Sequence, residues 1–134
     1  MGNSENTELF LGCLLCFLVA CSIKRKMRMA KYADMVTPAD RRRVAKLEAE
    51  SRSYKSEVRK LTKRLKKEKD PKEIEKIEKE LADIKKEMTK ISRDAEKLSS
   101  IYLTDKEKDE IRDRVDGIAQ ESVRESFFAY ICGE

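Results

Sequence analysis

The sequence predicts an all-α protein made of a short N-terminal transmembrane helix, an antiparallel coiled-coil hairpin and a C-terminal amphipathic helix. Charged residues make up 43% of the 134 residues, and there are only four glycines and two prolines, a composition typical of long helices. An uncharged apolar run lies near the N-terminus, and apolar residues recur at helical spacing through the middle of the chain. The sequence contains no histidine, the commonest general base and metal ligand. We therefore expect a non-enzymatic protein with no cofactor and no small-molecule substrate.

These features divide the chain into five segments. They are a short polar N-terminus (1–8), a transmembrane anchor (9–23), a basic juxtamembrane segment (24–36), a coiled-coil hairpin (37–103) with its turn near 68–72, and a C-terminal amphipathic helix with an apolar tip (104–134).

The anchor is an uncharged run of 15 residues, which forms a helix about 22 Å long. Roughly 20 residues are needed to span a bilayer unaided, so Thr7 and a snorkelling Lys24 are expected to extend the run. The residues expected to lie in lipid are Leu9, Phe10, Leu11, Leu14, Leu15, Phe17, Leu18, Val19 and Ile23.

Four basic residues, Lys24, Arg25, Lys26 and Arg28, follow the apolar run. By the positive-inside rule, the chain from Lys24 onward stays on the cytoplasmic side, or on the equivalent matrix or stromal side. A cleaved signal would carry its positive charge before the apolar run, so we expect an uncleaved single-pass anchor. The alternative is a bacterial lipoprotein, because residues 18–21 read LVAC.

The anchor contains three cysteines, of which Cys13 and Cys16 form a CxxC pair. Inside an apolar helix, and without histidine, we expect them to be small packing residues and not a metal or redox site. Cys21 lies at the basic edge, where reversible palmitoylation is chemically accessible. The start MGNSEN is a loose myristoylation pattern at Gly2, with Asn6 in place of the preferred Ser or Thr. Both lipidation sites are secondary alternatives.

A helix start follows the juxtamembrane segment, with Thr37 as N-cap, Pro38 at the first helical position and Asp40 in the first turn. Seven positions then recur at alternating steps of three and four, the spacing of a coiled-coil seam. They are Val44, Leu47, Ser51, Tyr54, Val58, Leu61 and Leu65.

The motif EKDPKE interrupts this pattern, with Asp70 as N-cap, Pro71 at the first helical position and Glu73 completing a pair like a capping box. A proline inside a helix costs about 3 kcal/mol or more, so one helix ends here and another begins. The second seam consists of Ile74, Ile77, Leu81, Ile84, Met88, Ile91, Ala95, Leu98 and Tyr102.

Folding the two seams back about this turn places Leu65 opposite Ile74 and Val44 opposite Ala95. We expect an antiparallel hairpin about 45 Å long. The alternative is that the two arms pack on the helices of a partner. Lysines crowd the exposed helix end at the turn and are expected to contact a soluble partner; they are Lys66, Lys67 and Lys69.

The C-terminal segment opens with a capping box, Thr104 with Glu107. Its apolar stripe is thin and is interrupted at Gly117, so this helix needs a surface to lie on. An apolar tip follows, which either caps the base of the hairpin or touches lipid or a partner. The stripe is Ile111, Val115, Ile118 and Ser122, and the tip is Phe127, Phe128, Tyr130 and Ile131.

The net charge of +5 is unevenly distributed. Residues 24–69 contain 18 basic and 6 acidic residues, whereas residues 70–134 contain 13 and 18. Such basic runs suit nucleic acid or an anionic membrane face. Because no aromatic residues are interleaved as a stacking platform, we expect membrane lipid and other protein subunits as partners, and no nucleic acid.

These features predict a non-enzymatic, single-pass membrane-anchored adaptor, or an accessory or scaffold subunit of a larger membrane complex, which docks partners through its hairpin. In organisation, residues 9 to about 102 resemble the start of proteins in the membrane insertase superfamily, including the tail-anchor insertases: a short transmembrane helix precedes a charged hairpin with a lysine-rich Asp-Pro turn. That resemblance implies a component of a membrane-protein insertion machinery. Those families continue with further transmembrane helices, for which residues 104–134 are too polar.

Overall fold

The computed structural model describes the backbone of residues 2–131 and the side chains of residues 6–120. This part of the chain is helical and contains no strand. The elements in chain order are α1 (Gly2–Met27), the 3-10 turn η1 (Ala30–Tyr32), α2 (Pro38–Lys67), α3 (Pro71–Tyr102) and α4 (Asp105–Ile131).

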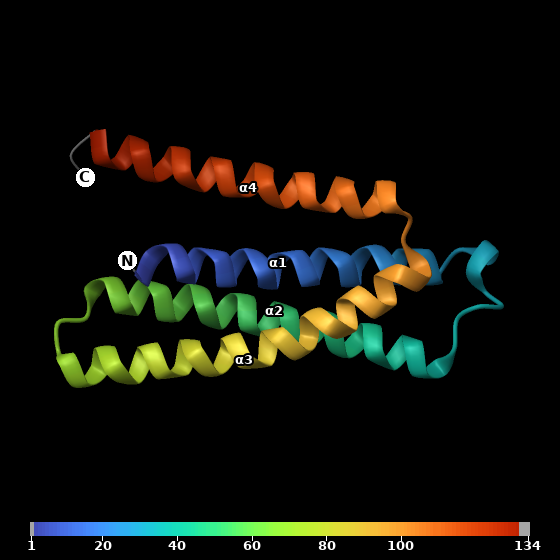
Figure 1. Ribbon diagram of the computed structural model, residues 1–134, viewed down its shortest axis with the longest axis horizontal. Helices are drawn as coiled ribbons and strands as arrows, with labels where there is room; N and C mark the ends of the chain where they lie inside the picture. Colours follow the sequence, from blue (N-terminus) through green and yellow to red (C-terminus); the bar gives the residue numbers. More distant parts are fainter. Residues whose placement is uncertain (1, 132–134) are drawn as a thin grey trace.

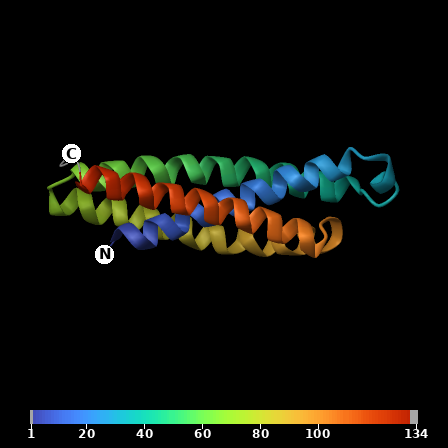
Figure 2. The same ribbon diagram turned by 90° about the horizontal axis from the view of Figure 1, so that it is seen from above.

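Helices α1, α2 and α3 pack as a bundle, and α4 lies along α1 (Figure 1). Helices α2 and α3 run antiparallel. A view from above also shows the helices lying side by side along the long axis of the molecule (Figure 2). The contact of α1 with α2 is the most extensive between any two helices of the described chain, and α3 contacts α1 about as extensively as it contacts α2. The seam pattern predicted the pairing of α2 with α3 alone, and the packing of α1 as a third helix of the bundle was not predicted.

The helices begin where the sequence places their caps. Thr37 Oγ1 accepts a hydrogen bond from the Asp40 backbone N–H at 3.0 Å, and Asp70 Oδ1 accepts one from the Lys72 N–H at 3.1 Å. Each bond satisfies one of the N–H groups that a helix start leaves without an intrahelical partner. The Glu68 N–H donates to a carbonyl of the preceding turn and closes α2.

The turn between α2 and α3 is shorter than predicted and occupies residues 68–70. Glu68, and not Glu73, supplies the reciprocal acidic group: its Oε1 accepts from the backbone N–H groups of Lys69 and Asp70, each at 3.2 Å. The two acidic residues of the turn therefore hold its backbone.

The two seams supply much of the core. Thirteen of their sixteen residues are buried, and Tyr54, Leu65 and Ile74 are half-buried. The polar exception, Ser51, is fully buried, and its hydroxyl donates to the carbonyl of Leu47 at 2.6 Å. This bond meets the hydrogen-bonding need of a hydroxyl inside an apolar seam.

Helix α1 contributes a stripe of five buried residues to the same core. The five recur at steps of three and four along α1, and three of them are small enough to let the helices approach closely. They are Cys13, Cys16, Ala20, Ile23 and Met27.

Candidate membrane anchor and docking surfaces

Within the described chain, one helix is long and apolar enough to cross a membrane. This segment of α1, Asn6–Met27, contains 22 residues and includes the predicted run 9–23. A helix of that length measures about 33 Å, close to the roughly 30 Å hydrocarbon core of a bilayer. Because α1 continues past Ile23, its last turn carries Lys24, Arg25 and Lys26.

In the bundle, the two sides of α1 differ in exposure. The stripe of Cys13, Cys16 and Ala20 is buried, whereas Leu11 and Leu18, on the opposite side, are half-buried. Only 33% of the most apolar 18-residue stretch of this helix is buried. A bundle this small therefore leaves a large part of an apolar helix incompletely covered.

Cations of α2 lie over the phenylalanine rings of α1, an arrangement that was not predicted from the sequence. The Lys55 ammonium is 4.6 Å and the Arg52 guanidinium 5.4 Å from the ring centroid of Phe17, and the Arg59 guanidinium is 5.8 Å from that of Phe10. Each such contact contributes about 0.5–1 kcal/mol at an exposed site. The signal was present in the sequence, because the two phenylalanines are seven residues apart and the three cations follow at steps of three and four.

The basic residues at the end of α1 pair with two different helices. Lys24 Nζ is 3.2 Å from a carboxylate oxygen of Glu48 on α2, and Lys26 Nζ is 2.7 Å from one of Glu107 on α4. The hydrogen bond from Lys26 holds the pKa of the Glu107 carboxyl below its ordinary value. Arg25 and Arg28, predicted with them as topology residues, are exposed.

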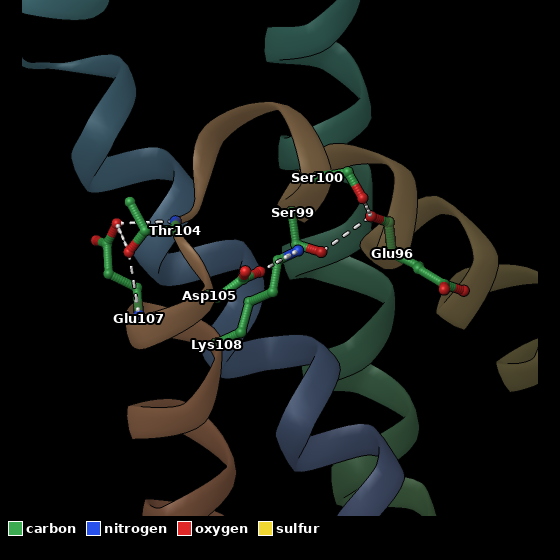
Figure 3. A network of polar contacts seen from close by, with 7 residues as sticks. All are labelled: Glu96, Ser99, Ser100, Thr104, Asp105, Glu107 and Lys108. Atoms are coloured by element: carbon green, nitrogen blue, oxygen red, sulfur yellow. Dashed lines mark hydrogen bonds and ion pairs between the residues drawn. The ribbon is translucent and has the colours of Figure 1, made fainter.

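Hydroxyl groups make local hydrogen bonds on both sides of the joint between α3 and α4 (Figure 3). Ser99 and Ser100 both donate to the backbone carbonyl of Glu96 at 2.9 Å. The capping box at the start of α4 forms as predicted: the Glu107 N–H donates to Thr104 Oγ1 at 3.2 Å, and the Thr104 N–H donates to the Glu107 carboxylate at 3.1 Å. Glu107 thus serves both the helix start and the ion pair to α1.

A buried hydrogen bond joins the start of α2 to the end of α3. The Tyr102 hydroxyl donates to Asp40 Oδ2 at 2.7 Å, and both residues are buried. Burial, reinforced by this bond to a carboxylate, raises the pKa of Tyr102 to about 12. The bond closes the hairpin at the end opposite its turn.

Lysines crowd the turn end of the hairpin. Lys66, Lys67 and Lys69 are all exposed, on a turn whose backbone is held by Glu68 and Asp70. The turn end of the hairpin is thus a cationic surface whose backbone is fixed by hydrogen bonds.

The remaining predicted sites are the two lipidation candidates and the apolar tip at the C-terminal end. Cys21 is half-buried within α1. The lipidation candidate Gly2 lies outside the described side chains. So does the apolar tip, Phe127, Phe128, Tyr130 and Ile131.

The contact of α1 with α3 and α4 is incompletely filled. A cavity of about 400 Å³ lies between the three helices, lined by Leu15, Val19 and Ile111 among others. At its edge, Cys16 Sγ is 3.7 Å from Ser92 Oγ of α3. Helix α1 is therefore packed less completely on this side.

No group of three or more Cys, Asp or Glu side chains among the described residues is arranged to hold a metal ion. Comparison of the chain with protein-family models, with curated proteins and with solved structures finds no match.

Proposed function

We propose that the protein is a non-enzymatic, single-pass membrane-anchored adaptor, in which α1 is the anchor and the α2–α3 hairpin docks other protein subunits. The observation that carries the proposal is the apolar segment Asn6–Met27, which is long enough to cross the hydrocarbon core of a bilayer and ends in a basic last turn. The core helix of a soluble protein can be equally apolar, but such a helix is mostly buried, whereas this one is buried over only 33% of its most apolar stretch.

The orientation follows from charge. Lys24, Arg25, Lys26 and Arg28 follow the apolar segment directly, so the hairpin is expected on the cytoplasmic side, or on the matrix or stromal side of an organelle. Basic residues at this position also attract anionic lipid headgroups.

The hairpin provides the docking element. Its helices contain 30 and 32 residues, and capping side chains and a buried seam set its geometry without any bound ligand. Its exposed lysines, Lys66, Lys67 and Lys69, suit an acidic surface on a partner.

Three measurements test the proposal. The full chain should resist alkaline extraction from membranes, and a membrane-impermeant maleimide should label Cys132 only from the side that corresponds to the cytoplasm. Extraction of the chain with peripheral proteins would refute the anchor. Blue native gels of cross-linked membranes should show the chain in a larger complex, and a chain found alone would refute the adaptor role.

A further inference from the structure

Helix α1 cannot cross a bilayer and keep its place on the hairpin. Its N-terminal end, at Asn6 and Leu9, shares a cavity with Leu65 and Leu81 near the turn of the hairpin. Its C-terminal end shares another cavity with Val44, near the start of α2. Since α1 lies along almost the whole hairpin, its insertion into lipid requires the two to separate.

We infer that the surface of the hairpin covered by α1 is a docking site for an apolar helix of a partner protein, and that it opens when α1 enters the bilayer. The inference rests on the proposed function, because membrane insertion is what vacates the site. We define this α1-binding face by its side chains that contact α1: Glu48, Arg52, Lys55, Arg59 and Ser92.

The chemistry of the partner can be deduced from the helix that occupies the site in this structure. Cationic side chains of α2 cover Phe10 and Phe17, so the partner should carry aromatic residues one heptad apart. Small residues such as Cys16 and Ala20 are buried against the hairpin, so the partner should carry a small-residue stripe beside the aromatic one. The hairpin residues Leu65, Leu81 and Met88 line cavities shared with α1, and they would become more exposed to water when α1 leaves. Such exposed apolar surface is typical of a protein–protein interface.

The positions of Cys16 and Ser92 can report both the packing of α1 on the hairpin and the docking of a partner helix. Because Cys16 Sγ lies 3.7 Å from Ser92 Oγ, a cysteine at position 92 is within reach of a disulfide after a small side-chain rotation. The full-length Ser92→Cys variant, treated with a copper–phenanthroline oxidant, should form a disulfide between Cys16 and the introduced cysteine in water. In phosphatidylcholine vesicles, the yield of this internal bond should fall strongly because α1 has inserted.

Docking is measured with the full-length double variant Cys16→Ser, Ser92→Cys, which cannot close this bond internally. The probe is a peptide of residues 6–27 that retains Cys16, with Cys13 and Cys21 changed to alanine. Leu11 and Leu18, on the side of the helix opposite the buried stripe, are changed to lysine to keep the peptide out of neutral lipid. Proteolysis and mass spectrometry identify the bond to position 92. The matched control replaces Ser92→Cys with Arg93→Cys, an exposed position on the same helix.

The peptide should cross-link to position 92 about tenfold more in vesicles than in water, since the apparent affinity scales with the fraction of open sites. The control should not respond to vesicles. If the internal bond forms equally well in vesicles, α1 has not inserted and the proposed function fails. If the internal bond is lost but the peptide cross-links no better than in the control, the anchor stands and the docking site is refuted.

Discussion

Helices α3 and α4 begin alike but are held very differently. Each starts after a short loop with a side-chain cap, and they contain 32 and 27 residues. Helix α3 buries nine residues and contacts both α1 and α2, whereas the described part of α4 buries Ile111 and Val115 and rests on α1. If α1 leaves for the bilayer, α3 keeps α2 as its partner, but α4 loses its main contact. The comparison shows that a cap sets where a helix begins, whereas the extent of its apolar stripe decides how firmly the helix is held.

The largest effect is expected in the seam between α2 and α3. Changing Val58 or Leu81 to aspartate should lower the free energy of unfolding of the full chain by about 3 kcal/mol or more, because a lone charge would be buried in an apolar core. Urea unfolding followed by circular dichroism measures the loss. Ser56→Asp, at an exposed position on α2, is the control and should stay within about 0.5 kcal/mol of the parent. Equal losses in the two variants would mean that the seam is not the core.

A smaller effect is expected where α3 meets the start of α2. Tyr102→Phe should cost about 1–2 kcal/mol near neutral pH, because it leaves the buried Asp40 carboxylate without its hydroxyl donor. The folded state raises the pKa of Tyr102 from 10.0 to about 12, so it favours the protonated hydroxyl. The stabilisation is therefore complete below pH 10 and is lost as the pH rises from 10 to 12.

The measurement is the difference in unfolding free energy between the parent and the Tyr102→Phe variant, across this pH range. That difference should shrink with rising pH, and a constant difference would show that the hydrogen bond does not control the titration.

A change at Glu107 should affect the stability of α4 without affecting that of α3. Glu107→Gln removes the ion pair to Lys26 and weakens the capping box, which should cost about 0.5–1 kcal/mol. Hydrogen exchange should speed up in α4 and stay unchanged in α3. Because the pKa of Glu107 is lowered, its contribution is present above pH 4.5 and is lost as the pH falls through the folded-state value. Faster exchange in both helices would contradict the separate attachment of α4.

The smallest effect on stability is expected at the hairpin tip. Reversing the charge of Lys66, Lys67 and Lys69 to glutamate should change the unfolding free energy by about 0.5 kcal/mol or less, because all three are exposed. The same change should weaken recovery of the membrane complex on native gels. Reversal of Lys76, Lys79 and Lys86, exposed on α3, is the matched control. An unfolded hairpin would show that the lysines are structural.

The sequence predicted those features that local chemistry decides. Thr37, Asp70 and Thr104 cap helices because their side chains accept from nearby backbone N–H groups, and the periodic seams identify the buried faces of α2 and α3. The packing of α1 on the hairpin was not predicted, because an apolar stripe can be buried equally well by lipid or by protein. Glu68 was missed in the turn because a side chain that accepts from the following N–H groups leaves no periodic signal.

The position of α1 in lipid tests the account most directly. The chain has no tryptophan, so Phe17→Trp introduces a single indole near the middle of Asn6–Met27. In phosphatidylcholine vesicles, its fluorescence should be quenched most by lipids brominated near the bilayer centre. An indole placed at the exposed position of Ile101 should be quenched little by any of them. Strongest quenching of the position-17 indole by lipids brominated close to the headgroup, or no quenching at all, would contradict a spanning α1.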